Sequence, residues 1–306
     1  MLSSLVRACA GGGARGILGM NRRNRDLIDL LNPRRHRRLA DDKILGKERL
    51  AAAKLPIART FAVIDSMRAV SRIRRLIGHL DHFVIKPSRG RAGGGIAVLG
   101  PRMAQGWRGS SGEPWSERDI RKRLGDILFG DYANRVSDRA LIEERIFAGP
   151  MLGDLPLLGL PDIRIITLDG EPVMGMVRLP TRQSAGKANL HLGAVGLGID
   201  LEKGRTTSAT WRHRPVTRHP ETDQPLGDLP IAAWPRVIEL ARAAARAFPL
   251  RYLGIDVAIT ADGDPVVLEA NVRPGLEIQN ANRHGLRPLL ECVVAATPQG
   301  EAGDAS

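Results

Sequence analysis

Two apolar runs flank a loop with four glycines between residues 83 and 99, and this stretch constrains the fold more than any other. The first run carries Lys86 near its end, and the second begins at Ile96. We expect a β-hairpin whose loop brings backbone N–H groups close to an anion, with Lys86 supplying a positive charge. From these residues alone, a glycine-rich turn with a solvated lysine remains an equal interpretation.

The order of residues in this loop excludes two familiar nucleotide motifs. A Walker loop requires Gly-Lys-Ser/Thr leading into a helix, and a dinucleotide fingerprint places its glycines between a strand and a helix. Here the lysine precedes the glycines, and the residues after them have the pattern of a strand. We therefore expect any nucleotide to be held by a sheet.

Composition limits the class of protein. The 306 residues suffice for one or two domains, and the sequence has no long uncharged apolar run that would predict a membrane span. The formal net charge of +13 favours acidic partners: a nucleotide, an acidic substrate, a polyanion or an anionic membrane face. A solvated arginine-rich surface is the alternative. Nucleic acid is disfavoured, because only 4% of residues are aromatic and the basic run 32–38 has no interleaved stacking side chains.

The chain ends and the cysteines give weaker indications. Cys9 and Cys292 lie far apart without metal-type spacing, which indicates neither a disulfide framework nor a zinc site and fits a cytoplasmic location. Residues 1–14 do not have the pattern of a signal peptide. Met20 is an alternative start to Met1.

Two apolar segments near the end of the chain each carry an acid where burial is expected. Asp256 lies within 253–259, and Glu269 and Asn271 lie within 266–272. The spacing of two puts Glu269 and Asn271 on one face of a strand, and a hairpin sets Asp256 opposite them. Such oxygen ligands suit Mg²⁺, with Mn²⁺ as a substitute, held together with nucleotide phosphates. A structural network of acids with arginines is the alternative.

Between these motifs we expect mixed helices and strands. Helices are predicted at 43–53, 66–80, 117–128 and 235–248, and Ser116 to Asp119 has the form of a capping box at the start of the third helix. Strands are predicted at 141–146, which would be half-buried, and at 162–167 and 172–179. The last two would form a hairpin from which Arg164 and Arg178 project, unless both are plain surface arginines. Residues 102–115, rich in Gly, Ser and Arg, are predicted to form a mobile loop.

The order of these residues resembles the ATP-grasp superfamily of carboxylate–amine ligases. More narrowly, it resembles the alpha-L-glutamate ligase-related group, akin to the ligases that add glutamate to ribosomal protein. The likeness rests on a spaced set and on the N-terminal pattern at 19–24, 32–35 and 41–43, and it covers about residues 19–290. The set consists of Lys43, Lys86 with its glycine loop, the segment Glu143–Ile146, Arg164, Arg178, Asn189, Asp256, Glu269 and Asn271.

The resemblance implies an α+β ATP-grasp fold in which two small α+β subdomains, with largely antiparallel sheets, sandwich ATP. The expected parts are a short basic segment (1–40), an ATP-grasp domain (41–290) and a flexible tail (291–306). The domain would divide into an ATP-lid subdomain (about 56–142) and a C-terminal metal-binding subdomain (about 143–290). Because only about forty residues precede Lys43, we expect part of the acceptor site to be missing, rebuilt, or supplied by a partner protein or second subunit.

The resemblance also implies roles for individual residues. Lys43 and Lys86 would contact phosphates under the loop Ser88–Gly95, including Gly93 and Gly94. Glu143, Glu144 and Ile146 would form the hinge beside adenine. Asp256, Glu269 and Asn271 would hold magnesium. The anion and acid substrate would be handled by Arg164, Arg178, Asn189 and Arg273.

The implied reaction joins a small-molecule acid, with glutamate as a candidate, to an amine or peptide acceptor through an acyl-phosphate. One alternative keeps the ATP site but modifies a sugar or polymer, with peripheral membrane contact, or transfers phosphate. Another is a basic binding module without catalysis.

Overall fold

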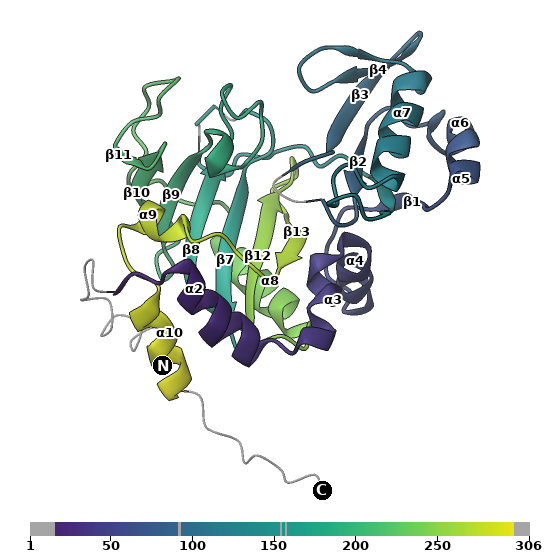
Figure 1. Cartoon of the computed structure of the whole chain (residues 1–306). Coiled ribbons are helices and arrows are strands. Elements are labelled where there is room, and N and C mark those ends of the chain that lie inside the picture. The colour runs from purple at the N-terminus through teal and green to yellow at the C-terminus, as the bar shows by residue number, and fades with distance from the viewer. Residues whose placement is uncertain (1–15, 91–92, 154, 157, 297–306) are drawn as a thin grey trace, which may run out of the picture.

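The computed structural model describes residues 16–90, 93–153, 155, 156 and 158–296, and these build two antiparallel sheets with helices packed on them (Figure 1). Met1, Cys9 and the side chain of Cys292 lie outside the described part, so the expectations about them are not tested. None of the described helices is long and apolar enough to cross a bilayer.

The first sheet has six strands in the order β1-β6-β2-β3-β4-β5. Three helices cover one face of it: α5 (Met67–Ser71), α6 (Ile73–Ile77) and α7 (Glu117–Leu128). Ser116 and Asp119 begin α7 with the predicted capping box. The strands are β1 (Thr60–Ile64), β2 (Phe83–Pro87), β3 (Ala97–Met103), β4 (Gly106–Gly109), β5 (Pro114–Trp115) and β6 (Ala140–Glu143).

Alternation along β2 gives this sheet two different faces. Phe83 and Ile85 are fully buried in the core under the helices, while Lys86 points to the opposite side. The pairing of Phe83 with Leu99 and of Ile85 with Ala97 forms the predicted hairpin around the glycine loop. The hairpin therefore presents its lysine away from the core.

The prediction of a mobile loop at 102–115 is wrong. This stretch contains the end of β3, all of β4 and β5, and Trp107 is buried. The Trp107 indole N–H donates to the Leu80 carbonyl at 2.9 Å, and its ring meets Phe83 edge-on at 5.3 Å between centroids. Burial of this tryptophan outweighs the local preference of glycine and serine for turns.

The second sheet has seven strands in the order β11-β10-β9-β8-β7-β12-β13. The hairpin predicted from 162–179 is present as β7 and β8, with Asp169 and Gly170 in its turn. Helix α8 (Trp234–Arg246) packs on β7, β8, β12 and β13. The strands are β7 (Asp162–Leu168), β8 (Glu171–Leu179), β9 (Val195–Asp200), β10 (Arg205–Trp211), β11 (Arg214–Val216), β12 (Tyr252–Ile259) and β13 (Pro265–Asn271).

The N-terminal part of the described chain packs against this second sheet. Leu27 and Ile28 are buried in the hydrophobic core of the second sheet, and the Asn32 side chain forms hydrogen bonds of 2.7–3.0 Å with the backbone of Arg251 and Tyr252. The segments here are the α-helices α2 (Met20–Arg22), α3 (Arg38–Asp41) and α4 (Lys43–Ala52), the π-helix η2 (Arg23–Asp29) and the 3₁₀ helix η3 (Arg34–His36). The domain boundaries expected from the sequence stay a prediction.

The chain passes between the sheets after Glu143. The strand predicted at 141–146 is β6, which ends at Glu143, and its four residues are all buried rather than half-buried. Glu144–Phe147 lie outside any strand, although the Glu144 N–H donates to the Arg59 carbonyl at 2.8 Å. Beyond β13 the chain forms α9 (Ile278–Asn282) and α10 (Arg287–Ala296), and η4 (Leu190–Leu192) precedes β9.

Candidate nucleotide and metal site

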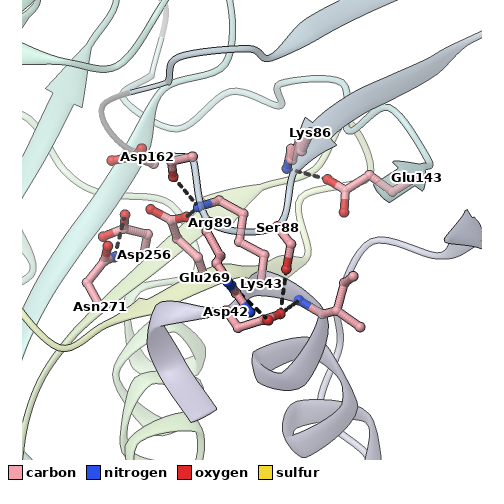
Figure 2. A network of polar contacts seen from close by, with 12 residues as sticks. Asp42, Lys43, Lys86, Ser88, Arg89, Glu143, Asp162, Asp256, Glu269 and Asn271 are labelled. Carbon is pink, nitrogen blue, oxygen red and sulfur yellow. Dashed lines mark hydrogen bonds and ion pairs between the residues drawn. The ribbon is translucent and has the colours of Figure 1, made fainter. Parts of the chain in front are cut away.

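The start of α4 fastens the glycine loop to the rest of the molecule. The buried Asp42 side chain caps the helix by accepting from the Ile44 amide at 3.0 Å and also accepts from the Ser88 hydroxyl (Figure 2). The Lys43 N–H donates to the Ser88 carbonyl at 2.9 Å. Burial alone would raise the pKa of Asp42, but the bonds from Ser88 and Leu45 and the charge of Arg139 outweigh it and lower that pKa.

Lys43 joins the loop to the second sheet. Its Nζ lies 3.0 Å from the Gly90 carbonyl oxygen and 3.3 Å from Glu269 Oε2 on β13. One ammonium group therefore contacts both the glycine loop and an expected metal ligand.

Glu143 forms ion pairs with two lysines on the face of β6 that points away from the core between the first sheet and helices α5, α6 and α7. Its carboxylate pairs with Lys86 on β2 and, at 2.7 Å, with Lys47 on α4. Burial would raise the pKa of Glu143, but the two ammonium groups outweigh it and lower that pKa. Burial would lower the pKa of Lys86, yet Glu143 raises it, whereas burial prevails at Lys47 and lowers its pKa.

These charged residues line one pocket between α4, β2, β6 and β13. Its lining includes Lys43, Lys47, Lys86, Glu143 and Glu269. Three ammonium groups and two carboxylates thus meet where the two sheets approach each other. Three cations within reach of one pocket suit a polyanionic ligand such as a nucleotide triphosphate.

A ladder of arginine–aspartate contacts crosses three strands of the second sheet, β8, β7 and β12. Arg178 on β8 grips Asp162 on β7 with Nε and Nη2, both at 2.6 Å. Arg164 on β7 grips Asp256 on β12 with Nε at 2.8 Å and Nη2 at 2.6 Å. Registry places these residues opposite one another, since Asp162 faces Arg178 and Asp256 faces both Arg164 and Glu269.

The two aspartates of this ladder differ in their titration. Burial, reinforced by the charge of Asp256, raises the pKa of Asp162 to about 6 although Arg178 opposes the shift. Burial would raise the pKa of Asp256 too, but Arg164 and Arg178 outweigh it and hold that pKa well below its usual range. Asp256 therefore stays ionised in the folded protein.

The structure brings together Asp256, Glu269 and Asn271, the residues expected to hold Mg²⁺ with phosphates, but both carboxylate oxygens of Asp256 accept hydrogen bonds from arginine. They lie on the paired strands β12 and β13, and Asn271 Nδ2 is 3.2 Å from Asp256 Oδ2. Within the described residues, no three His, Cys, Asp or Glu side chains cluster closely enough to hold a metal alone. Two carboxylates and an amide leave several positions of an octahedral ion for phosphate oxygens and water.

The remaining predicted residues have the following positions and contacts. Arg273 follows β13 and pairs with Asp41 at 3.0 Å, and the Asn189 side chain accepts from the His191 amide at 2.9 Å. Glu144 is exposed and accepts from the Arg59 amide at 3.2 Å, and Ile146 is partly buried in the connection between the sheets.

The glycine loop is shaped by positive backbone angles. Gly93 and Gly95 have φ of +74° and +75°, which side-chain-bearing residues rarely adopt, and Gly94 lies between them in the same turn. A Cβ on Gly95 would lie 2.7 Å from the Tyr132 ring, whereas one on Gly93 would lie 3.6 Å from Lys187 Cδ. The loop thus packs on Tyr132 at Gly95 and approaches Lys187, which follows β8 of the second sheet, at Gly93.

Three residues at this site had not been singled out from the sequence: Asp42, Lys47 and Asp162. Lys47 follows Lys43 by four positions, so both lie on one helix face, and this spacing was a usable signal. The sequence indicates Asp42 only as an acid at the start of a helix. Its bond to Ser88 joins residues 46 positions apart and could not be predicted from neighbouring residues. The pairing of Asp162 with Arg178 depends on strand register, which the hairpin turn alone could have suggested.

The sequence matches the family described as sugar-transfer associated ATP-grasp over residues 22–295. The two antiparallel sheets with a pocket between them are accordingly an ATP-grasp fold, as expected. The chain belongs to this sugar-transfer associated ATP-grasp family. The narrower resemblance to the glutamate ligase-related group receives no support from the match, and a comparison with curated proteins gave no match.

Several solved structures of ATP-grasp ligases are similar to the chain at low identity. The ligase PsnB with its minimal precursor is 18% identical with a TM-score of 0.44, covering 87% of this chain and 62% of its own. The D-cycloserine synthetase DcsG is 14% identical with a TM-score of 0.46, covering 84% and 70%. D-alanine–D-alanine ligase from Bacillus anthracis with ATP is 13% identical with a TM-score of 0.46, covering 84% and 65%. The chain thus spans about three fifths of the length of PsnB.

Proposed function

We propose that this protein is an ATP-dependent ligase that joins a carboxylate to an amine through an acyl-phosphate. The observation that carries the proposal is the convergence of Lys43, Lys47 and Lys86 on one pocket beside Glu269, in a chain of an ATP-grasp family. Lys43 and Lys86 offset part of the triphosphate charge, and Glu269 lines the same pocket, where it would hold a phosphate-bound cation.

The nucleotide takes the following contacts in this proposal. Lys43 and Lys86 bind phosphate oxygens, and the loop Ser88–Gly95 covers them. Glu143, Glu144 and Ile146 flank the adenine. Asp256, Glu269 and Asn271 hold Mg²⁺, which when bound neutralises phosphate charge and orients the terminal phosphate.

The chemistry requires two successive transfers. A carboxylate oxygen of the acid attacks the γ-phosphorus, the bond to the bridging oxygen breaks, and ADP leaves. The amine nitrogen then attacks the acyl carbon, phosphate leaves, and the nitrogen loses a proton as the amide forms. Arg164, Arg178, Asn189 and Arg273 lower the repulsion between the two anions and orient the acid.

Water must be kept from the acyl-phosphate, because hydrolysis would waste it. The glycine loop supplies that exclusion in our proposal, since its backbone is tied to α4 at Ser88 and approaches Lys187 at Gly93. The acid is a small molecule, with glutamate as the first candidate, and the acceptor is an amine or peptide. A second subunit or partner protein completes the acceptor site, and the reaction takes place in the cytoplasm.

The proposal is tested by measuring ADP release over a matrix of amino acids and amines, alone and in pairs. A ligase releases ADP only when an acid and an amine are both present, and mass spectrometry then finds the amide. Lys86→Ala and Glu269→Ala should abolish that release. Absence of acid- and amine-dependent ADP release across a broad matrix would argue against a ligase.

A second candidate is modification of a sugar or polymer from the same ATP site. The description of the matched family as sugar-transfer associated favours it. The two candidates differ in their products. A product that carries phosphate or a modified sugar, without a new amide, would select the second.

A further inference from the structure

Helices α5 and α6 bury one side against the first sheet and turn the other to solvent. Val70, Ile73 and Ile77, at helical spacing, are at most 3% exposed and belong to the first core. The outward positions are strongly basic. They hold the exposed side chains of Arg68, Arg72, Arg74 and Arg75.

These four arginines have no ion pair within the described residues. Residues 66–80 contain no acid at all. On the adjacent α7, by contrast, Arg121 pairs with Glu117 at 2.6 Å and donates to the Val70 carbonyl at 3.1 Å. Arg121 is thus bonded within the fold, whereas the four arginines of the α5–α6 segment have no ion pair in the part of the chain that the structure describes.

Apolar side chains lie exposed among these charges. Met67 on α5 is 52% exposed and Leu76 on α6 is 36% exposed. Single exposed apolar residues are common, but here two lie on short helices that, together with Arg72 between them, carry four arginines without an ion pair among the described residues. We call this set of six residues the α5–α6 surface.

The α5–α6 surface lies away from the proposed nucleotide pocket. The two helices cover the face of the first sheet that buries Ile85, while Lys86 and Glu143 project from the other face. Figure 1 shows α5 and α6 beyond the first sheet and α7, far from the second sheet. A large partner could bind there without blocking the pocket.

We propose that the α5–α6 surface docks on an anionic phospholipid bilayer. Arginine guanidinium groups bind lipid phosphates while their stems lie along the apolar boundary, and Met67 and Leu76 enter that boundary. Single-stranded nucleic acid would be bound through stacking aromatic side chains, and the α5–α6 surface has none. The α5–α6 surface combines exposed arginines with exposed Met67 and Leu76, and such a combination binds to an anionic membrane interface.

The test is flotation of the full chain with vesicles of phosphatidylcholine, with or without phosphatidylglycerol. Binding should require phosphatidylglycerol and weaken with salt. One basic side chain near an anionic surface strengthens binding roughly fivefold, so Arg72→Glu with Arg75→Glu should lower it about 25-fold or more. The matched control is Arg34→Glu with Arg35→Glu, which makes the same charge change at exposed arginines of η3.

The outcomes separate a specific surface from general basicity. Loss of binding in the α5–α6 variant with retention in the control supports the proposal, and equal loss in both overturns it. Met67→Ser should also weaken vesicle binding while leaving binding to a single-stranded RNA oligonucleotide unchanged. Unchanged vesicle binding in Met67→Ser, or no binding of the parent chain to anionic vesicles, would overturn the lipid assignment. Equal melting temperatures of all variants show that they fold.

Discussion

Arg178 on β8 reaches past β7 to Asp256 on β12, with 2.8 Å between its Nη2 and Asp256 Oδ2. The same guanidinium grips Asp162 on the intervening strand. Asp256 therefore receives charge from two arginines, because Arg164 holds it as well. The acid–arginine network that the sequence left open is present, and the proposed metal ligand is part of it.

Replacing Lys43 by alanine should weaken nucleotide binding about tenfold to a hundredfold, since hydrogen bonds to charged groups contribute roughly 1.5–3 kcal/mol. Titration with a fluorescent ATP analogue measures the change. Lys54→Ala is the control, because that lysine is exposed just beyond α4. Equal affinities for Lys43→Ala and the parent protein would remove Lys43 from the proposed phosphate contacts.

Glu143→Gln should destabilise the protein by about 3 kcal/mol, because it leaves Lys47 and Lys86 partly buried without their counter-charge. Urea unfolding followed by circular dichroism measures the free energy of unfolding. The neighbouring Glu144→Gln should change it by less than about 0.5 kcal/mol, since Glu144 is exposed. Similar effects at both positions would contradict the pairing.

Titration of the Asp162 carboxyl group should lower the free energy of unfolding as the pH rises. Its pKa is about 6 in the folded protein against an ordinary value of 3.8, so at intermediate pH the folded state holds a proton that the unfolded state has lost. The contribution is fully present below the unfolded pKa and is lost as the pH rises through about 6.

Asp162→Asn removes this titration. The free energy of unfolding of the parent protein, minus that of Asp162→Asn, should therefore decrease between about pH 4 and pH 6. Urea unfolding at a series of pH values gives the difference, in which titration of groups outside the Asp162–Arg178–Asp256 network cancels. Parallel pH profiles would show that Asp162 keeps an ordinary pKa.

Gly125→Ala should stabilise the protein by about 0.5–1 kcal/mol, because alanine favours the helix interior and a Cβ at this position would have no atom within 4 Å apart from its chain neighbours and the nearby backbone of α7. Thermal unfolding measures the gain. Gly78→Ala provides the contrast, since its Cβ would lie 2.5 Å from the Arg74 carbonyl oxygen. A loss of stability in Gly125→Ala would mean that α7 has no room for the methyl group.

Local patterns predicted the elements that carry the site. Alternation around the glycine loop indicated the hairpin β2–β3, the spacing of Glu269 and Asn271 indicated one face of a strand, and the cap at Ser116 indicated the start of α7. Each depends on neighbours in sequence, because strand and helix periodicities are local.

Tertiary structure decided which charges meet and where glycine-rich sequence becomes strand. β6 lies between β1 and β2, so Glu143 reaches Lys86 on the neighbouring strand and Lys47 on α4. The glycine-rich segment 102–115 forms strands rather than a loop, because the core buries Trp107. The sequence by itself determined the residue types and their faces. Pairing followed only from strand order and register, since residues distant in sequence meet there.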